Sequence, residues 1–222
     1  AAAQERYDLG VREINTKSEW QGCGPAAAAN LLGYWADQGF EIFKGISHTD
    51  TSNVTSAQVG LLLSDLAYEF GTDAESGGSW GNTIAPGIKR TLKGRKVVGC
   101  YLAEFDFLWN IGPINDYKRI VSEINSGRPV YLAGSLNPRS VFCVHAGCVT
   151  GYDYDEGLFG AYKLLVHDGY NDGTSTNANP VEELWRVIPV IPTPFTPNAC
   201  TMITLNMLEA DDVNCPCGVW EV

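Results

Sequence analysis

Cys23 has the sequence surroundings of a nucleophile. It lies in the segment WQGCGPAAAANLLGYW, between two glycines and directly before a stretch with the apolar spacing of a helix. The amino end of a helix carries partial positive charge and N–H groups that stabilise a thiolate, and the glycines let a substrate backbone approach closely. The backbone N–H of Cys23 can also donate to an oxyanion. The same position is compatible with a small buried residue that has no chemical role.

The histidines restrict the choice of a base, since the sequence contains only three of them. His145 lies in the apolar, strand-like segment VFCVHAGCVTGY, where an ionisable ring is costly unless it has a partner. A core histidine with a satisfied hydrogen bond is the alternative. Asp168 ends the next expected strand, LLVHDG, and pairing of the two strands would bring its carboxylate to the imidazole. Cysteine, histidine and aspartate are the nucleophile, base and orienting group of acyl-transfer chemistry.

This combination resembles the bacteriocin-processing type of papain-like cysteine peptidases and their stand-alone secreted relatives. The similar segments are GCGPAAAANLLGYW, INSGRPVYLAG, HAGCVTGYD and LLVHDGYNDG, in the family's order and with 122 positions between Cys23 and His145. The resemblance implies a papain-like fold, peptide hydrolysis through a thioester acyl-enzyme, and Cys23, His145 and Asp168 as the triad. It implies a peptide or protein substrate and no metal or organic cofactor. It covers the helix at 22–38 and residues 115–173, and leaves 40–110 and the last 40 residues unaccounted for.

One position departs from the family's pattern. Papain-like enzymes carry a glutamine about six residues before the nucleophile, and its amide completes the oxyanion hole; here that position is Lys17. Gln21 and Asn15 are the nearby amides that can take its place. Loss of one oxyanion donor costs roughly 10²–10³ in rate. A catalytically weak or inactive module with a binding or structural role is therefore an alternative, as is amide transfer or deamidation with the same triad.

The remaining polar candidates receive less specific interpretations. His167 neighbours Asp168 on a strand, so its side chain is expected on the opposite face, either at the surface or supporting the triad from outside it. His48 lies in a polar loop and is expected to be solvated. The acidic segment GYDYDEG, with Asp153 and Asp155, is read as a hairpin turn rather than a calcium loop.

Composition excludes several classes of partner. The chain has 26 acidic and 15 basic residues, a formal net charge of −11, and its basic residues are scattered, so nucleic acid is not an expected partner. No apolar run approaches the roughly 18 residues that a membrane-spanning helix needs. The length of 222 residues predicts a single domain.

Seven cysteines are many for a cytosolic protein of this size, and they favour a secreted or extracellular protein. The first residue is Ala, which fits removal of a signal peptide. An odd number of cysteines is compatible with one reactive thiol and up to three disulfides. Cys200 with Cys215 or Cys217 is the expected bridge, and seven reduced, largely buried cysteines are the alternative.

Helix signals dominate the first part of the chain and strand signals the second. Helices are expected at 22–38, from Thr55 or Ser56 to Gly71, from Asn82 or Thr83 to Gly94, and at 115–125. Strands are expected within 129–135, 142–153, 160–169, 183–190 and 199–208, with a further one in 96–105. This order predicts an α+β domain over 1–222, with a helical part at about 22–127 packed on an antiparallel sheet at about 128–210.

Overall fold

The structure of the protein is a computed structural model. It describes residues 4–8, 22–40, 42, 56–75, 77–95, 100–108, 113–134, 145–155, 161–167, 182–187 and 198–207.

The described residues form four helices and seven strands. The helices are α1 (Cys23–Asp37), α2 (Ser56–Phe70), α3 (Gly81–Gly94) and α4 (Pro113–Asn125). The strands are β1 (Gln4–Asp8), β2 (Cys100–Leu108), β3 (Val130–Gly134), β4 (His145–Asp155), β5 (Ala161–His167), β6 (Glu182–Val187) and β7 (Asn198–Asn206). Each of the four expected helices and six expected strands is present, so the α+β class is confirmed.

All seven strands belong to one sheet, in the order β2-β7-β3-β4-β5-β6, with β1 also paired to β4. Every pairing in it is antiparallel. β3 and β1 share one edge of β4, because β3 pairs with His145–Val149 and β1 with Gly151–Asp155. The sheet thus includes β1 and β2, two strands that precede residue 128 in the chain.

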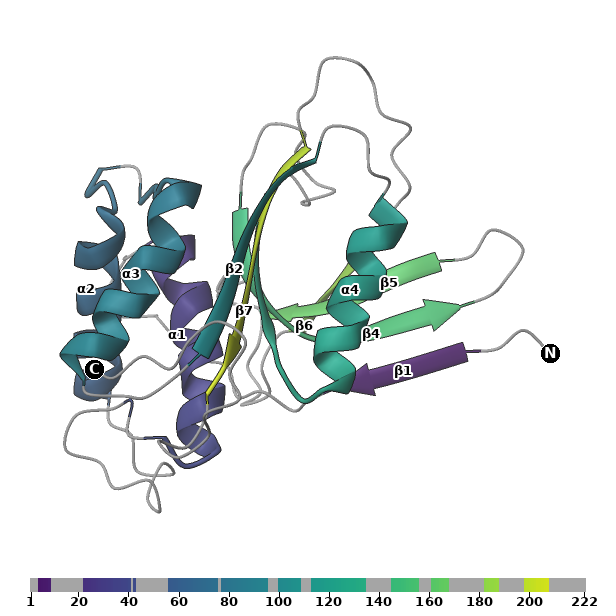
Figure 1. Cartoon of the computed structure of the whole chain (residues 1–222), viewed down its shortest axis with the longest axis horizontal. Coiled ribbons are helices and arrows are strands. Elements are labelled where there is room, and N and C mark those ends of the chain that lie inside the picture. The colour runs from purple at the N-terminus through teal and green to yellow at the C-terminus, as the bar shows by residue number, and fades with distance from the viewer. Residues whose placement is uncertain are drawn as a thin grey trace.

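The helices cover both faces of the sheet. Figure 1 shows α1, α2 and α3 grouped on one side of β2 and β7, and α4 on the other side. One core cluster joins the first three helices to Tyr131, Ala146 and Cys148 on β3 and β4. A second cluster joins Ile120 and Ile124 of α4 to the opposite face of the same strands. Residues that alternate along β3 therefore serve two different cores, as expected for a sheet covered on both faces.

α1 is the central helix of the larger core. Almost all of its residues are buried, including the run Ala26–Ala29, whose small side chains let neighbouring elements approach the helix closely. It packs against α2 and against β3 and β4. The hydroxyl of Tyr34 donates to the Gly127 carbonyl at 2.6 Å, which ties the second half of α1 to the turn after α4. α1 is consequently fixed along its length, and so is the direction in which its amino end points.

None of the helices in the described ranges combines the length and apolarity needed to cross a bilayer.

Candidate active site

Cys23 is the first residue of α1 and is partly buried. The first backbone hydrogen bond of the helix runs from the Ala26 N–H to the Gly22 carbonyl at 3.3 Å, so the N–H groups of Cys23 and Gly24 precede it. No acidic residue occupies the first turn. The partial positive charge at this end of the helix is therefore not offset by a carboxylate of the first turn itself, and it favours a thiolate at Cys23.

Gly22 shapes the approach to Cys23 because of its backbone conformation. Its φ of 84° and ψ of 161° fall in a region that is essentially restricted to glycine. A Cβ atom placed on Gly22 would lie 2.1 Å from the carbonyl oxygen of Gly77. The loop between α2 and α3 thus passes directly over the amino end of α1, and only a glycine leaves room for it.

Two hydroxyl groups lie beside the first turn of α1, and a third contacts one of them. A Cβ placed on Gly24 would lie 3.2 Å from Oγ of Ser79 and 3.5 Å from the hydroxyl oxygen of Tyr131. Ser79 belongs to the α2–α3 loop, and its Oγ is 2.8 Å from Oγ1 of Thr72 in the same loop. Tyr131 comes from β3 of the sheet. Gly24, the residue after Cys23, is therefore in contact with polar groups from the loop and from the sheet.

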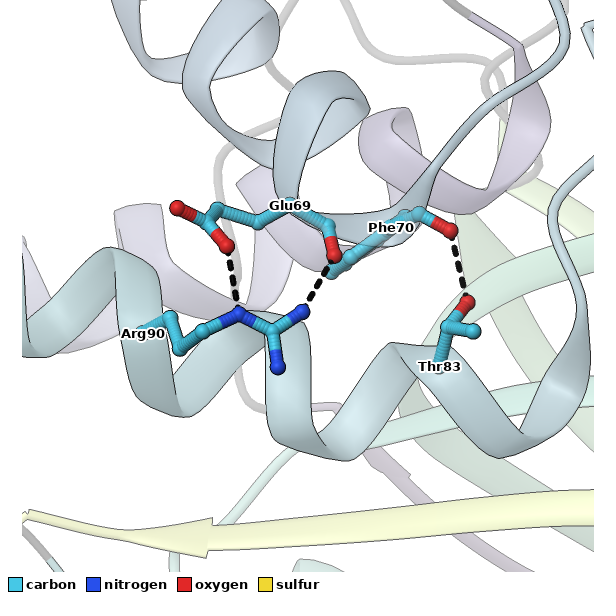
Figure 2. A network of polar contacts seen from close by, with 4 residues as sticks. All are labelled: Glu69, Phe70, Thr83 and Arg90. Atoms are coloured by element: carbon cyan, nitrogen blue, oxygen red, sulfur yellow. Dashed lines mark hydrogen bonds and ion pairs between the residues drawn. The ribbon is translucent and has the colours of Figure 1, made fainter.

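The α2–α3 pair that carries this loop is held by polar contacts at its end. Figure 2 shows Arg90 of α3 donating to both the side chain and the backbone carbonyl of Glu69, at 2.5 Å and 2.6 Å, and Thr83 donating to the Phe70 carbonyl at 2.7 Å. Gly71 ends α2 with a φ of 62°. Within the loop, Asp73 exchanges backbone hydrogen bonds with Gly77 and Gly78. The loop residues that lie beside α1 thus belong to a segment that is held by several hydrogen bonds.

Tyr131 and Cys23 influence each other electrostatically. Burial of the Tyr131 phenol raises its pKa, and the negative charge of a Cys23 thiolate raises it further. Ionisation of Cys23 therefore strengthens the tendency of the phenol to keep its proton. The amino end of α1 consequently combines a thiol with a neutral O–H group buried next to it.

Of the other two predicted triad residues, only His145 lies within the described part of the chain. His145 is the first residue of β4, and its backbone pairs with Gly134 of β3. Gly134 follows Tyr131 by three residues on that strand, a distance of about 10 Å along the strand. The expected antiparallel pairing of β4 with β5 is confirmed, beginning at Cys148 and His167. Asp168 lies outside the described residues, as do the oxyanion candidates Gln21 and Asn15 and the departing Lys17.

His167 corrects one expectation. Its side chain is fully buried, so the surface interpretation is wrong. The sequence indicated that a strand ends near His167. It did not indicate that α1 covers one face of this part of the sheet and α4 the other, because those contacts join residues that are far apart in the chain. Cys148, its partner on β4, is also fully buried, and burial raises the pKa of its thiol. Of Cys23 and Cys148, Cys23 is partly exposed, as a nucleophile must be, whereas Cys148 is fully buried.

The family model described as the Peptidase_C39 like family matches residues 8–188, which is most of the chain. The chain belongs to this family. The matched range contains Cys23, His145 and Asp168 and extends from the last residue of β1 to the residue after β6. Membership confirms the papain-like fold and places the protein in the papain-like cysteine peptidase superfamily, whose substrates are peptides and proteins. No curated protein matches the sequence.

The residues that sequence reasoning missed are Gly77, Ser79 and Tyr131. The first two lie in a segment that the sequence resemblance left uncovered, and no motif marked them. Tyr131 lies in the segment INSGRPVYLAG, which carried part of the resemblance, but nothing in its spacing indicated contact with Gly24. The available signal was the pair of glycines around Cys23, which predicted that some backbone comes close without showing which one.

Proposed function

We propose that this protein is a cysteine peptidase that hydrolyses peptide bonds through a Cys23, His145 and Asp168 triad. The observation that carries the proposal is the position of Cys23: a partly buried thiol at the amino end of a helix whose first turn contains no acidic residue. Family membership supports the reaction class. The bacteriocin-processing subtype and secretion, the latter supported by the seven cysteines, belong to the same proposal.

In the proposed mechanism the Cys23 thiolate, paired with protonated His145, attacks the carbonyl carbon of a peptide bond. The negative charge on the carbonyl oxygen is stabilised by the Cys23 N–H at the start of α1. His145 then gives its proton to the leaving amine, and a thioester links the acyl part of the substrate to Cys23. Water, deprotonated by His145, attacks the thioester and releases the new carboxyl terminus. Asp168 keeps the imidazole in the tautomer and orientation that these steps require.

The proposal is tested by incubating the protein with an unstructured substrate protein and identifying new chain ends by mass spectrometry. We expect cleavage by the wild-type protein, no cleavage by Cys23→Ala, and retained cleavage by Cys148→Ala, since Cys148 is buried away from solvent. Cleavage that survives in Cys23→Ala would overturn the assignment of the nucleophile.

A second candidate is a papain-like module that binds rather than cleaves. Lys17, at the position where related enzymes carry the oxyanion glutamine, favours it. In that case the same incubation yields no new chain ends from either the wild-type protein or Cys23→Ala. Conversion of substrate glutamines to glutamate without chain cleavage, or incorporation of an added amine, would instead identify the deamidase or amide-transfer chemistry that the same triad supports.

A further inference from the structure

We propose that Tyr131 is a positioning residue for Cys23: its hydroxyl, buried beside the first turn of α1, orients and stabilises the thiolate. This inference rests on the proposed function, because it assigns a role in activating the same nucleophile. It concerns a residue of β3 that lies outside the triad.

The position of Tyr131 carries the inference. The side chain is 1% exposed, and its hydroxyl oxygen lies 3.5 Å from the place that a Cβ on Gly24 would occupy. Cys23 packs against the core cluster to which Tyr131 belongs. The phenol oxygen therefore lies at the end of α1 that bears the nucleophile, on a side chain that is almost entirely buried.

A hydroxyl in such a place needs a polar partner. A buried O–H group without one costs the full penalty of its desolvation, and a phenylalanine would fill nearly the same volume without that cost. A thiolate is a strong acceptor, and a hydrogen bond to a charged group is stronger than one between neutral groups. Tyr131 is thus suited to compensate the charge of Cys23 on the side that faces the core.

The protonation states of the two groups are compatible with this role. Burial and the charge of Cys23 both raise the pKa of Tyr131, so its proton is retained and can be donated when Cys23 ionises. Other titratable groups on the described elements packed here include Cys148 and His167 on β4 and β5, Tyr34 and Asp37 further along α1, and Asp73 and Glu75 in the α2–α3 loop. His145, at the start of β4, is the proposed base. These groups are the same in a Tyr131 variant, so the difference from the wild-type protein isolates the phenol.

The test compares two variants that each lose one buried phenol hydroxyl. Tyr131→Phe removes the group beside Cys23, and Tyr152→Phe removes the hydroxyl that donates to Asn125 Oδ1 at 3.0 Å on the opposite face of the sheet. The rate of Cys23 alkylation by iodoacetamide is measured against pH in both variants and in the wild-type protein. We expect the midpoint to rise by about 1 pH unit in Tyr131→Phe, with alkylation about 10-fold slower at pH values below both midpoints, and to stay unchanged in Tyr152→Phe.

The outcomes separate this inference from the proposed function. A low midpoint in the wild-type protein that Tyr131→Phe leaves unchanged would overturn the inference alone. A wild-type midpoint as high as that of an ordinary thiol would overturn the proposed function and the inference with it. An equal rise in both variants would show a general loss of stability and would also overturn the inference.

A second measurement does not depend on the folding of Tyr131→Phe. In wild-type protein labelled with 3-fluorotyrosine, the ¹⁹F resonance of one buried tyrosine should shift with the same midpoint as Cys23 alkylation. This shift should persist in Tyr152→Phe and disappear in Cys23→Ala. Absence of any fluorotyrosine resonance that follows Cys23 would refute the proposed contact.

Discussion

Replacement of Gly22 by alanine tests how tightly the α2–α3 loop is packed over the nucleophile. Two separate costs arise. The backbone of Gly22, with φ 84° and ψ 161°, is in a region that is strained for any residue with a side chain. The new Cβ would also lie 2.1 Å from the Gly77 carbonyl oxygen, whereas real Cβ atoms essentially never come closer than 3.0 Å. Because the obstacle is backbone, the loop or the helix end must move by about 1 Å.

The magnitude follows from these two costs. A strained backbone conformation of this kind costs about 1–3 kcal/mol. Forced displacement of packed atoms costs a further ~1–3 kcal/mol. Gly22→Ala should therefore lower the free energy of unfolding by about 2–6 kcal/mol, a large part of the ~5–15 kcal/mol that holds a typical domain together. In a domain of this size that corresponds to a fall in Tm of roughly 4–24 °C.

Gly39→Ala is the matched control. Gly39 follows the opposite end of the same helix and also has a positive φ, 108°, but nothing lies within 4 Å of a Cβ placed on it. It should therefore show only the conformational cost of about 1–3 kcal/mol. Both variants are compared by urea unfolding, followed by circular dichroism. Gly22→Ala should be the less stable of the two by about 1 kcal/mol or more, and it alone should slow the alkylation of Cys23.

Equal stability of the two variants, within about 0.5 kcal/mol, would refute the close contact between Gly22 and Gly77. A destabilised Gly22→Ala variant whose Cys23 reacts as fast as in the wild-type protein would instead refute the influence of this contact on the thiol. In that case the loop would be packed over the helix without shaping the surroundings of the thiol.

Two further predictions concern the core. Burial raises the pKa of Cys148 above the ordinary thiol value of about 8.5, so the unfolded chain loses this proton before the folded chain does. The free energy of unfolding should therefore fall as pH rises above about 8.5, by up to ~1.4 kcal/mol per pH unit. Urea unfolding between about pH 8 and pH 10 should show a shallower fall for Cys148→Ala, and identical slopes would contradict the prediction. Gly87→Ala should destabilise the protein by about 1–3 kcal/mol despite its better helix propensity, because the new Cβ would lie 2.4 Å from the Phe70 ring. Gly94→Ala is the control, because nothing lies within 4 Å of a Cβ placed on Gly94, and it should be neutral or stabilising by up to ~1 kcal/mol. Equal effects of the two substitutions on thermal unfolding would show that α2 and α3 do not meet at Gly87.

The helices could be predicted from sequence because their signals are local. Gly71 was expected to end a helix, and it does so with a φ of 62°, a conformation that favours glycine. The helix expected to end at Gly94 does so, and α3 continues through Pro86, which lies near its start, where proline is tolerated. The antiparallel β4–β5 hairpin also followed from two neighbouring strand patterns and the short segment between them.

Contacts between distant parts of the chain could not be predicted in this way. The segment KVVGCYLAEF was recognised as a strand, but not its pairing with β7, in which Cys100 lies opposite Asn206. The burial of His167 was missed for the same reason. Alternation along a strand shows which side chains share a face of the sheet, but not which elements cover that face. Around Cys23 the chemistry was visible in the residue types, whereas Ser79 and Tyr131 reach Gly24 only through the fold.

The most direct test of the account is the reactivity of Cys23 towards iodoacetamide between about pH 4 and pH 9, with modified cysteines located by peptide mass mapping. Cys148 serves as an internal control, because it is a free thiol that is fully buried. We expect selective modification of Cys23 with a midpoint well below the value of about 8.5 for a free thiol, and no modification of Cys148 in the folded protein. Modification of Cys23 that is absent, or no faster than that of an ordinary thiol, would contradict an activated nucleophile at the start of α1.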